Sequence, residues 1–87
     1  MGVATIDANG MITKANERAG KLLTAGAGGI VGQNAAACCG AVLGGLVEQV
    51  RREKSISLET ELAGGRWRVL GRGMAGTVIL VFLEAEA

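Results

Sequence analysis

Two adjacent cysteines, Cys38 and Cys39, are the residues of this sequence with the sharpest chemistry. An accessible thiolate can be oxidised reversibly, so one hypothesis for this chain is a thiol-based redox sensor. The competing interpretation is structural, with two small, half-buried side chains in an alanine-rich segment. We favour the structural interpretation, because no basic residue lies close to the pair in the sequence to stabilise a thiolate.

The remaining composition excludes most catalytic and cofactor chemistry. The chain has no histidine and no tyrosine, and its aromatic residues are Trp67 and Phe82. Without histidine it can form no Ser–His or Cys–His dyad and no His-ligated haem or zinc site. An iron–sulfur cluster needs about four thiolates, which one chain cannot supply. We therefore predict that the protein is not an enzyme.

Charge and hydropathy limit the partners. Nine Lys and Arg against eight Asp and Glu leave a net charge of +1, without the clustered basic surface that nucleic-acid binding requires. The apolar run Thr77–Leu83 is shorter than the roughly 20 residues that span a membrane. Neighbouring cysteines are too close for a disulfide with each other, which predicts a reducing, cytoplasmic setting. The 87 residues, 1–87, suit a single domain, which we interpret as a part of a longer regulator.

The first half of the chain predicts a hairpin and a short helix. Val3–Asp7 and Met11–Thr13 are short β-prone runs around an Asn-Gly turn, across which Asp7 can accept backbone N–H groups. Asn16 is a good helix N-cap. After it, Ala19, Leu22 and Leu23 recur at helical spacing.

The middle of the chain predicts a second helix. Residues 35–40 are small, and we expect a loop or a loose helical turn there. From Ala41 to Lys54 an amphipathic pattern predicts a helix, weakened by Gly44 and Gly45. Its expected apolar face comprises Val42, Leu43, Leu46, Val47 and Val50.

Three strands are predicted after this helix, over residues 55–62, 66–74 and 77–83. The second of them places Gly71 and Gly73 on the same face as Trp67 and Val69, which leaves room either for a small ligand or for a closely packed helix. The third, Thr77–Leu83, is apolar on both faces. A strand of this kind belongs in the centre of a sheet, with its second face shielded by a flanking segment or by another subunit. The fold class is therefore α+β, with helices over one face of one antiparallel sheet.

The order of these residues resembles a PAS domain over essentially the whole chain. The motif Asp7-x-x-Gly10-x-Ile12 is followed by Asn16, Ala19, Leu22-Leu23 and Val31-Gly32, and the C-terminal part is similar to the last three strands of the family. The resemblance implies a PAS-like five-stranded antiparallel sheet in the spatial order 2-1-5-4-3, with short helices on one face.

The resemblance also implies a function. PAS domains are sensory and dimerisation modules of sensor histidine kinases in two-component systems and of transcription regulators, and they pass a signal to an effector domain of the same longer chain. A homodimer is therefore expected. Either a small-molecule ligand lies between the helices and the sheet, or side chains fill that space and dimerisation itself is the function. Flavin-photosensing members carry a reactive cysteine directly after a Gly-x-Asn motif, whereas here Gly32-Gln33-Asn34 is followed by Ala35. A flavin–cysteinyl adduct is therefore not expected, and the cofactor, if any, stays unknown.

These expectations assign residues to two surfaces, although the pattern leaves open which face of the last strand points to the pocket. The predicted ligand pocket is lined by Ile6, Leu22, Val31, Leu43, Leu46, Val47, Leu58, Trp67, Val69 and Ile79. The predicted dimer face consists of Val78, Leu80 and Phe82.

Overall fold

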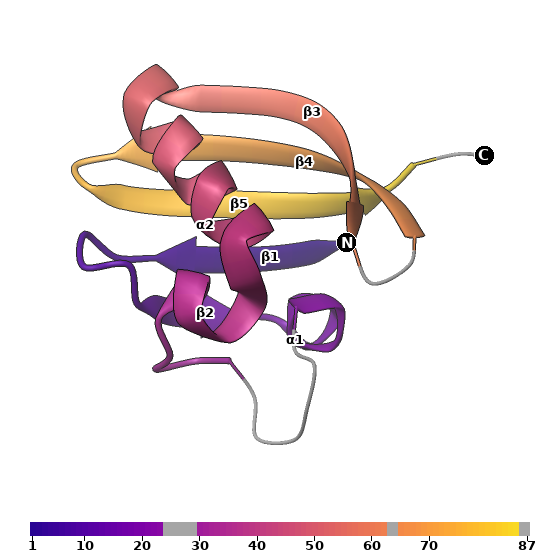
Figure 1. The fold of residues 1–87 in the computed structure, drawn as a ribbon, viewed down its shortest axis with the longest axis horizontal. Coiled ribbons are helices and arrows are strands. Elements are labelled where there is room, and N and C mark those ends of the chain that lie inside the picture. The colour runs from indigo at the N-terminus through magenta and orange to yellow at the C-terminus, as the bar shows by residue number, and fades with distance from the viewer. Residues whose placement is uncertain (24–29, 63–64, 86–87) are drawn as a thin grey trace.

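In a computed structural model the chain forms one five-stranded antiparallel sheet with helices on one side (Figure 1). The structure describes residues 1–23, 30–62 and 65–85, apart from the side chains of Cys38, Cys39 and Ala41. The elements in chain order are β1 (Gly2–Ile6), β2 (Ile12–Ala15), α1 (Glu17–Leu23), α2 (Ala35–Glu53), β3 (Ser55–Leu62), β4 (Gly65–Met74) and β5 (Thr77–Glu84). The strands lie in the order β2-β1-β5-β4-β3, which confirms the predicted order and the central place of β5.

The predicted N-terminal hairpin is confirmed, and its turn has the expected chemistry. Asp7 Oδ1 accepts the backbone N–H groups of Asn9 at 2.9 Å and of Met11 at 3.0 Å. Gly10 has φ 82°, a conformation in which other residues are strained. β5 pairs with the other side of β1, where Val3 lies opposite Val81, and so joins the hairpin to the C-terminal strands.

Asn16 caps α1, as predicted. Its Oδ1 accepts the N–H of Ala19 at 2.9 Å, which satisfies one of the free donors of the first helical turn. The same oxygen accepts the N–H of Val3 at 3.1 Å. Asn16 therefore fixes the start of α1 against β1.

The second helix begins earlier than predicted. Asn34 Oδ1 accepts the N–H groups of Ala36 at 3.0 Å and of Ala37 at 3.1 Å, so helical structure starts at Ala35. Gly40, with φ 86° and ψ 179°, interrupts the helical backbone. The segment 35–40 is thus a capped helical turn that meets the main helix at a glycine kink.

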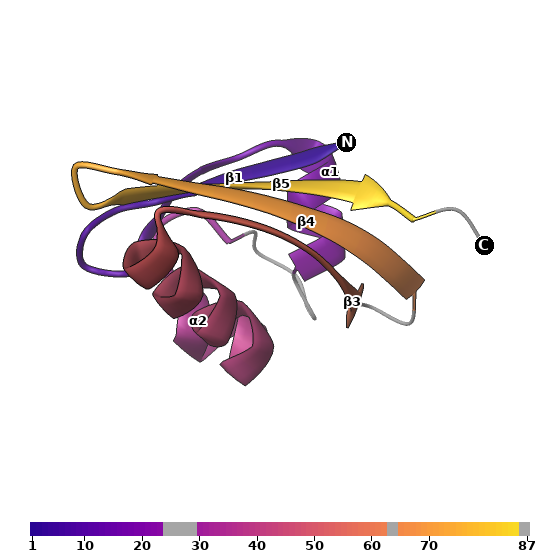
Figure 2. The same ribbon diagram turned by 90° about the horizontal axis from the view of Figure 1, so that it is seen from above.

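The main part of α2 packs under the sheet (Figure 2). The predicted apolar face is correct for Leu43, Leu46, Val47 and Val50, which are buried. Val42 is a correction, because its side chain is 52% exposed. It lies about 100° around the helix from Leu43, since a helix has about 3.6 residues per turn, and this rotation carries it off the buried face.

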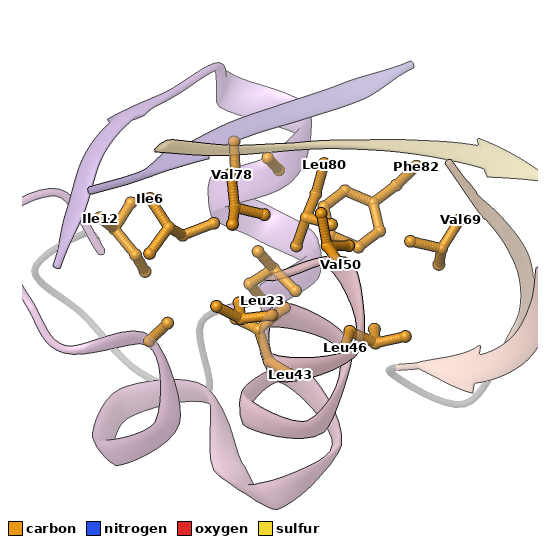
Figure 3. Close-up of a cluster of buried hydrophobic side chains, with 14 of the residues drawn as sticks. Ile6, Ile12, Leu23, Leu43, Leu46, Val50, Val69, Val78, Leu80 and Phe82 are labelled. Atoms are coloured by element: carbon orange, nitrogen blue, oxygen red, sulfur yellow. The ribbon is translucent and has the colours of Figure 1, made fainter. Parts of the chain in front are cut away.

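The hydrophobic core fills the layer between the helices and the sheet (Figure 3). From β5, the side chains of Val78, Leu80 and Phe82 point toward α2. Neither described helix has the length and apolar character needed to span a bilayer.

The C-terminal strands also have the expected cross-strand charges. Glu59 on β3 accepts from Arg66 at 3.3 Å and from Arg68 at 3.4 Å, both on β4. These pairs are on the sheet face away from the helices, and each contributes roughly 0.2–1 kcal/mol to the free energy of unfolding.

Candidate functional site

The predicted ligand pocket coincides with the hydrophobic core. The predicted pocket residues that are buried there are Ile6, Leu43, Leu46, Val47 and Val69. Those that lie half-buried at its margin are Leu22, Leu58 and Trp67. These side chains pack against one another, so among the described residues the layer is occupied by the protein itself.

The two glycines of β4 make room for a helix. A Cβ atom added to Gly71 would lie 2.5 Å from Cγ2 of Val50, and one added to Gly73 would lie 3.3 Å from the Val50 carbonyl oxygen. Val50 belongs to α2 and is fully buried. Of the two explanations that the sequence leaves open for these glycines, the close approach of α2 is therefore the correct one.

Two predicted pocket residues lie elsewhere, and Val31 is the first. Its side chain is 58% exposed. It lines an open hollow of about 530 Å³ beside β1 and β2, together with Val3, Thr5, Thr13, Lys14, Ala15 and Asn16. A valine in a turn belongs to no periodic pattern that would indicate where its side chain points. The prediction that Val31 lines the pocket was therefore wrong.

The second correction concerns the faces of β5, which are the reverse of the prediction. Val78, Leu80 and Phe82, assigned to a dimer face, are fully buried beneath the sheet. Ile79, assigned to the pocket, is 37% exposed on the opposite face. The physical reason is the register with β4, because Leu80 lies opposite Gly71 and therefore shares the face that packs on α2.

The sequence contained a signal for this register. Ala75 and Gly76 form a two-residue turn, so Met74 lies opposite Thr77 and each step back along β4 matches a step forward along β5. Counting from the turn reaches the pair Val69–Phe82. Side chains directly opposite each other lie on the same face of a sheet. Because the side chain of Val69 was predicted to face the helices, the side chain of Phe82 should have been predicted to face them too.

An apolar surface remains on the sheet face away from the helices. Val3 of β1 lies opposite Val81 of β5, and Val81 lies opposite Leu70 of β4, so three half-buried side chains cross the middle of the sheet. With Ile79 and Leu83 they form what we call the outer apolar row. In the part of the chain that the structure describes, both helices lie on the other side of the sheet (Figure 2).

Charged side chains border the outer apolar row. On β4 the outward positions besides Leu70 include Arg66, Arg68 and Arg72, all exposed. On the β2 side Lys14 is exposed. An apolar centre with a polar rim is the usual anatomy of a protein–protein contact surface.

Arg51 connects three separate parts of the fold. From α2 its guanidinium donates to the carbonyl oxygen of Asp7 at 2.6 Å and to that of Gly76 at 2.8 Å. It thereby ties the helix to the β1–β2 turn and to the β4–β5 turn. Arg51 also lines two clefts on either side of it, of about 230 and 160 Å³.

We expect Arg51→Ala to lower the free energy of unfolding by about 1–2 kcal/mol, because two hydrogen bonds from a half-buried charged group are lost. Arg52→Ala is the matched control, since Arg52 is exposed and should cost less than about 0.5 kcal/mol. Urea denaturation of the two variants measures the difference. Equal costs would show that the Arg51 contacts do not stabilise the fold.

The cysteine pair lies in the first turns of α2, before the kink at Gly40. The side chains of Cys38 and Cys39 lie outside the described part of the structure, so the redox hypothesis stays a prediction. Within the described residues, no three side chains of the usual metal-ligating types gather into a group that could hold a metal ion.

No protein-family model matches the sequence, and no curated protein matches it either. Membership of the PAS family therefore stays a prediction that depends on the quoted motif and on the strand order.

Proposed function

We propose that the chain is a PAS-type signalling module that acts by pairing two copies through the outer apolar row. The observation that carries this proposal is the half-exposed apolar surface in the middle of the sheet, on the side away from the helices. A sheet face in contact with water normally carries polar side chains, whereas the outward positions of β5 include Ile79, Val81 and Leu83. The packed core supports contact between proteins as the output, rather than capture of a small molecule.

The size of the face fits a reversible dimer. The five strands contain 35 residues, an average of seven per strand, and at about 4.8 Å between strands and about 3.3 Å per residue they give a face of roughly 600 Å². Two such faces would bury roughly 1,200 Å², at the lower end of specific interfaces. We therefore expect a dissociation constant in the micromolar range, so that association responds to concentration or to a signal. An effector domain of the same longer chain, such as a kinase or a transcription regulator, would receive that signal.

The test is Val81→Glu, which places a charge in the centre of the outer apolar row. We expect the dimer of the unaltered protein to weaken about thirtyfold or more, as for the loss of a central interface contact. Sedimentation equilibrium over a range of concentrations measures this change, with circular dichroism to verify the fold.

Val42→Glu is the matched control, because it makes the same replacement at an exposed valine on the helix side of the molecule. It should leave association unchanged. A monomer at high micromolar concentration in the unaltered protein, or a dimer disrupted by Val42→Glu alone, would contradict the proposal.

A further inference from the structure

The two edges of the sheet differ in whether the chain itself covers them. At the β2 edge, the N–H of Ile12 donates to the Gln33 carbonyl oxygen at 2.9 Å, and the Ile12 carbonyl accepts the N–H of Gly32 at 2.7 Å. Just before β2, the Gly10 carbonyl accepts the N–H of Ala35 at 2.8 Å. β2 is also short, and its pairing with β1 contains a register shift. This edge therefore offers little backbone to another strand.

The β3 edge has none of these features among the described residues. β3 pairs with β4 over eight residues without a shift in register, and no described strand lies beyond it. Proline, lysine and bulges usually protect such an edge. The chain contains no proline and β3 contains no lysine, and the charged residues of β3 are the two glutamates Glu59 and Glu61.

The outward-pointing backbone groups of β3 can be identified. The N–H of Gly73 donates to the Lys54 carbonyl at 2.8 Å, so this pair is of the hydrogen-bonded type. Hydrogen-bonded and non-hydrogen-bonded pairs alternate along an antiparallel ladder. The residues that direct their N–H and C=O groups away from β4 are therefore Ser55, Ser57, Glu59 and Glu61. All of them are exposed.

We infer that this free edge binds an extended peptide in which basic and apolar residues alternate. An added strand shares the two faces of the sheet, so every second side chain would lie beside Glu59 and Glu61 on the outer face. The others would lie beside Leu58 and Leu62, which are half-buried on the inner face.

β4 illustrates this chemistry on the other side of β3. Its Arg66 and Arg68 contact Glu59, and between them Trp67 packs at the margin of the core. A basic peptide is favoured over a second copy of β3, because a second copy would bring further glutamates to the same face. This inference concerns an edge rather than the outer apolar row and does not rest on the proposed dimer.

The experiment titrates the folded protein with a short peptide that alternates arginine and valine. We expect saturable binding and slower amide hydrogen exchange at Ser57 and Glu59, because their N–H groups become hydrogen-bonded. Ser57→Pro removes one outward N–H without removing a bond to β4, and it should weaken binding about tenfold. Ser57→Thr keeps the N–H and should bind like the unaltered protein.

Two control peptides keep the test independent of whether Ser57→Pro folds. A peptide with N-methylated amides on its docking edge and one with glutamate in place of arginine should both fail to bind. Binding without slower exchange at Ser57 and Glu59, or equal binding of the N-methylated peptide, would reduce the interaction to charge attraction and overturn the inference. A dimer of the unaltered protein that Ser57→Pro dissociates would overturn it in favour of a second copy. The Val81→Glu variant, which should not dimerise, should still bind the peptide with unchanged affinity. The two proposals can therefore fail independently, and the experiment shows which of them fails.

Discussion

Replacing Leu80 with alanine is expected to lower the free energy of unfolding by about 2–5 kcal/mol, because a fully buried side chain is truncated between the sheet and α2. A domain of this size is stabilised by only about 4–13 kcal/mol, so this single change should remove a large share of the total free energy of unfolding. Chemical denaturation followed by the fluorescence of Trp67 measures the loss.

Ile79→Ala is the matched control for Leu80→Ala. The two residues are neighbours in β5, but Ile79 is exposed on the outer face, and its truncation should cost less than about 1 kcal/mol in the monomer. The comparison should be made at low protein concentration, where a dimer does not contribute. A larger cost at Ile79 than at Leu80 would mean that the faces of β5 are assigned wrongly.

Gly71→Ala is expected to destabilise the domain by about 1–3 kcal/mol through overpacking. The added Cβ would lie 2.5 Å from Val50 Cγ2, 2.9 Å from Ile56 Cγ1 and 3.1 Å from Leu80 Cδ2. Val50 is β-branched and held in a helix, so it has little freedom to rotate away. The helix must therefore move away from the sheet, and thermal denaturation should detect this as a lower midpoint.

Gly45→Ala is the control with the opposite sign. Apart from its chain neighbours and the adjacent helical backbone, no atom lies within 4 Å of a Cβ at Gly45, which is in the interior of α2, so alanine should stabilise the helix by about 0.5–1 kcal/mol. Combining Gly71→Ala with Val50→Ala should cost less than the sum of the two single changes, because the second change opens space for the first. Additive costs would contradict the proposed contact between Gly71 and Val50.

Local chemistry made much of the fold predictable. Three predicted features are confirmed: the Asn-Gly turn, the hydrogen bonds to the Asp7 carboxylate and the Asn16 cap. Each depends on groups only a few residues apart in the sequence. The central place of β5 was predictable because apolar side chains on both faces need cover on both sides. The sequence left a loop or a loose helical turn open for residues 35–40, because the small residues before Gly40 show no amphipathic pattern, and the structure has the helical turn, capped by Asn34.

Features that depend on distant contacts were not predictable in the same way. β5 is apolar on both faces, so its own pattern does not distinguish Leu80 from Ile79, and the two faces are separated only by the register with β4 that the turn at Ala75 and Gly76 sets. Arg51 acts through carbonyl groups of Asp7 and Gly76, which are far from it in the sequence, and any arginine in the last turns of a helix would look the same. The free edge of β3 became apparent only when the hydrogen bonds at both edges of the sheet were compared.

The pairing of β1 with β5 has a consequence for how the chain reaches this structure. These strands lie near opposite ends of the sequence, and contacts between distant segments form slowly because a long loop must first close. Until β5 inserts between β1 and β4, its continuous run of apolar residues is exposed and could assemble with other nascent chains. Rapid formation of the β4–β5 hairpin, whose turn is local, would shield this segment on one side during synthesis.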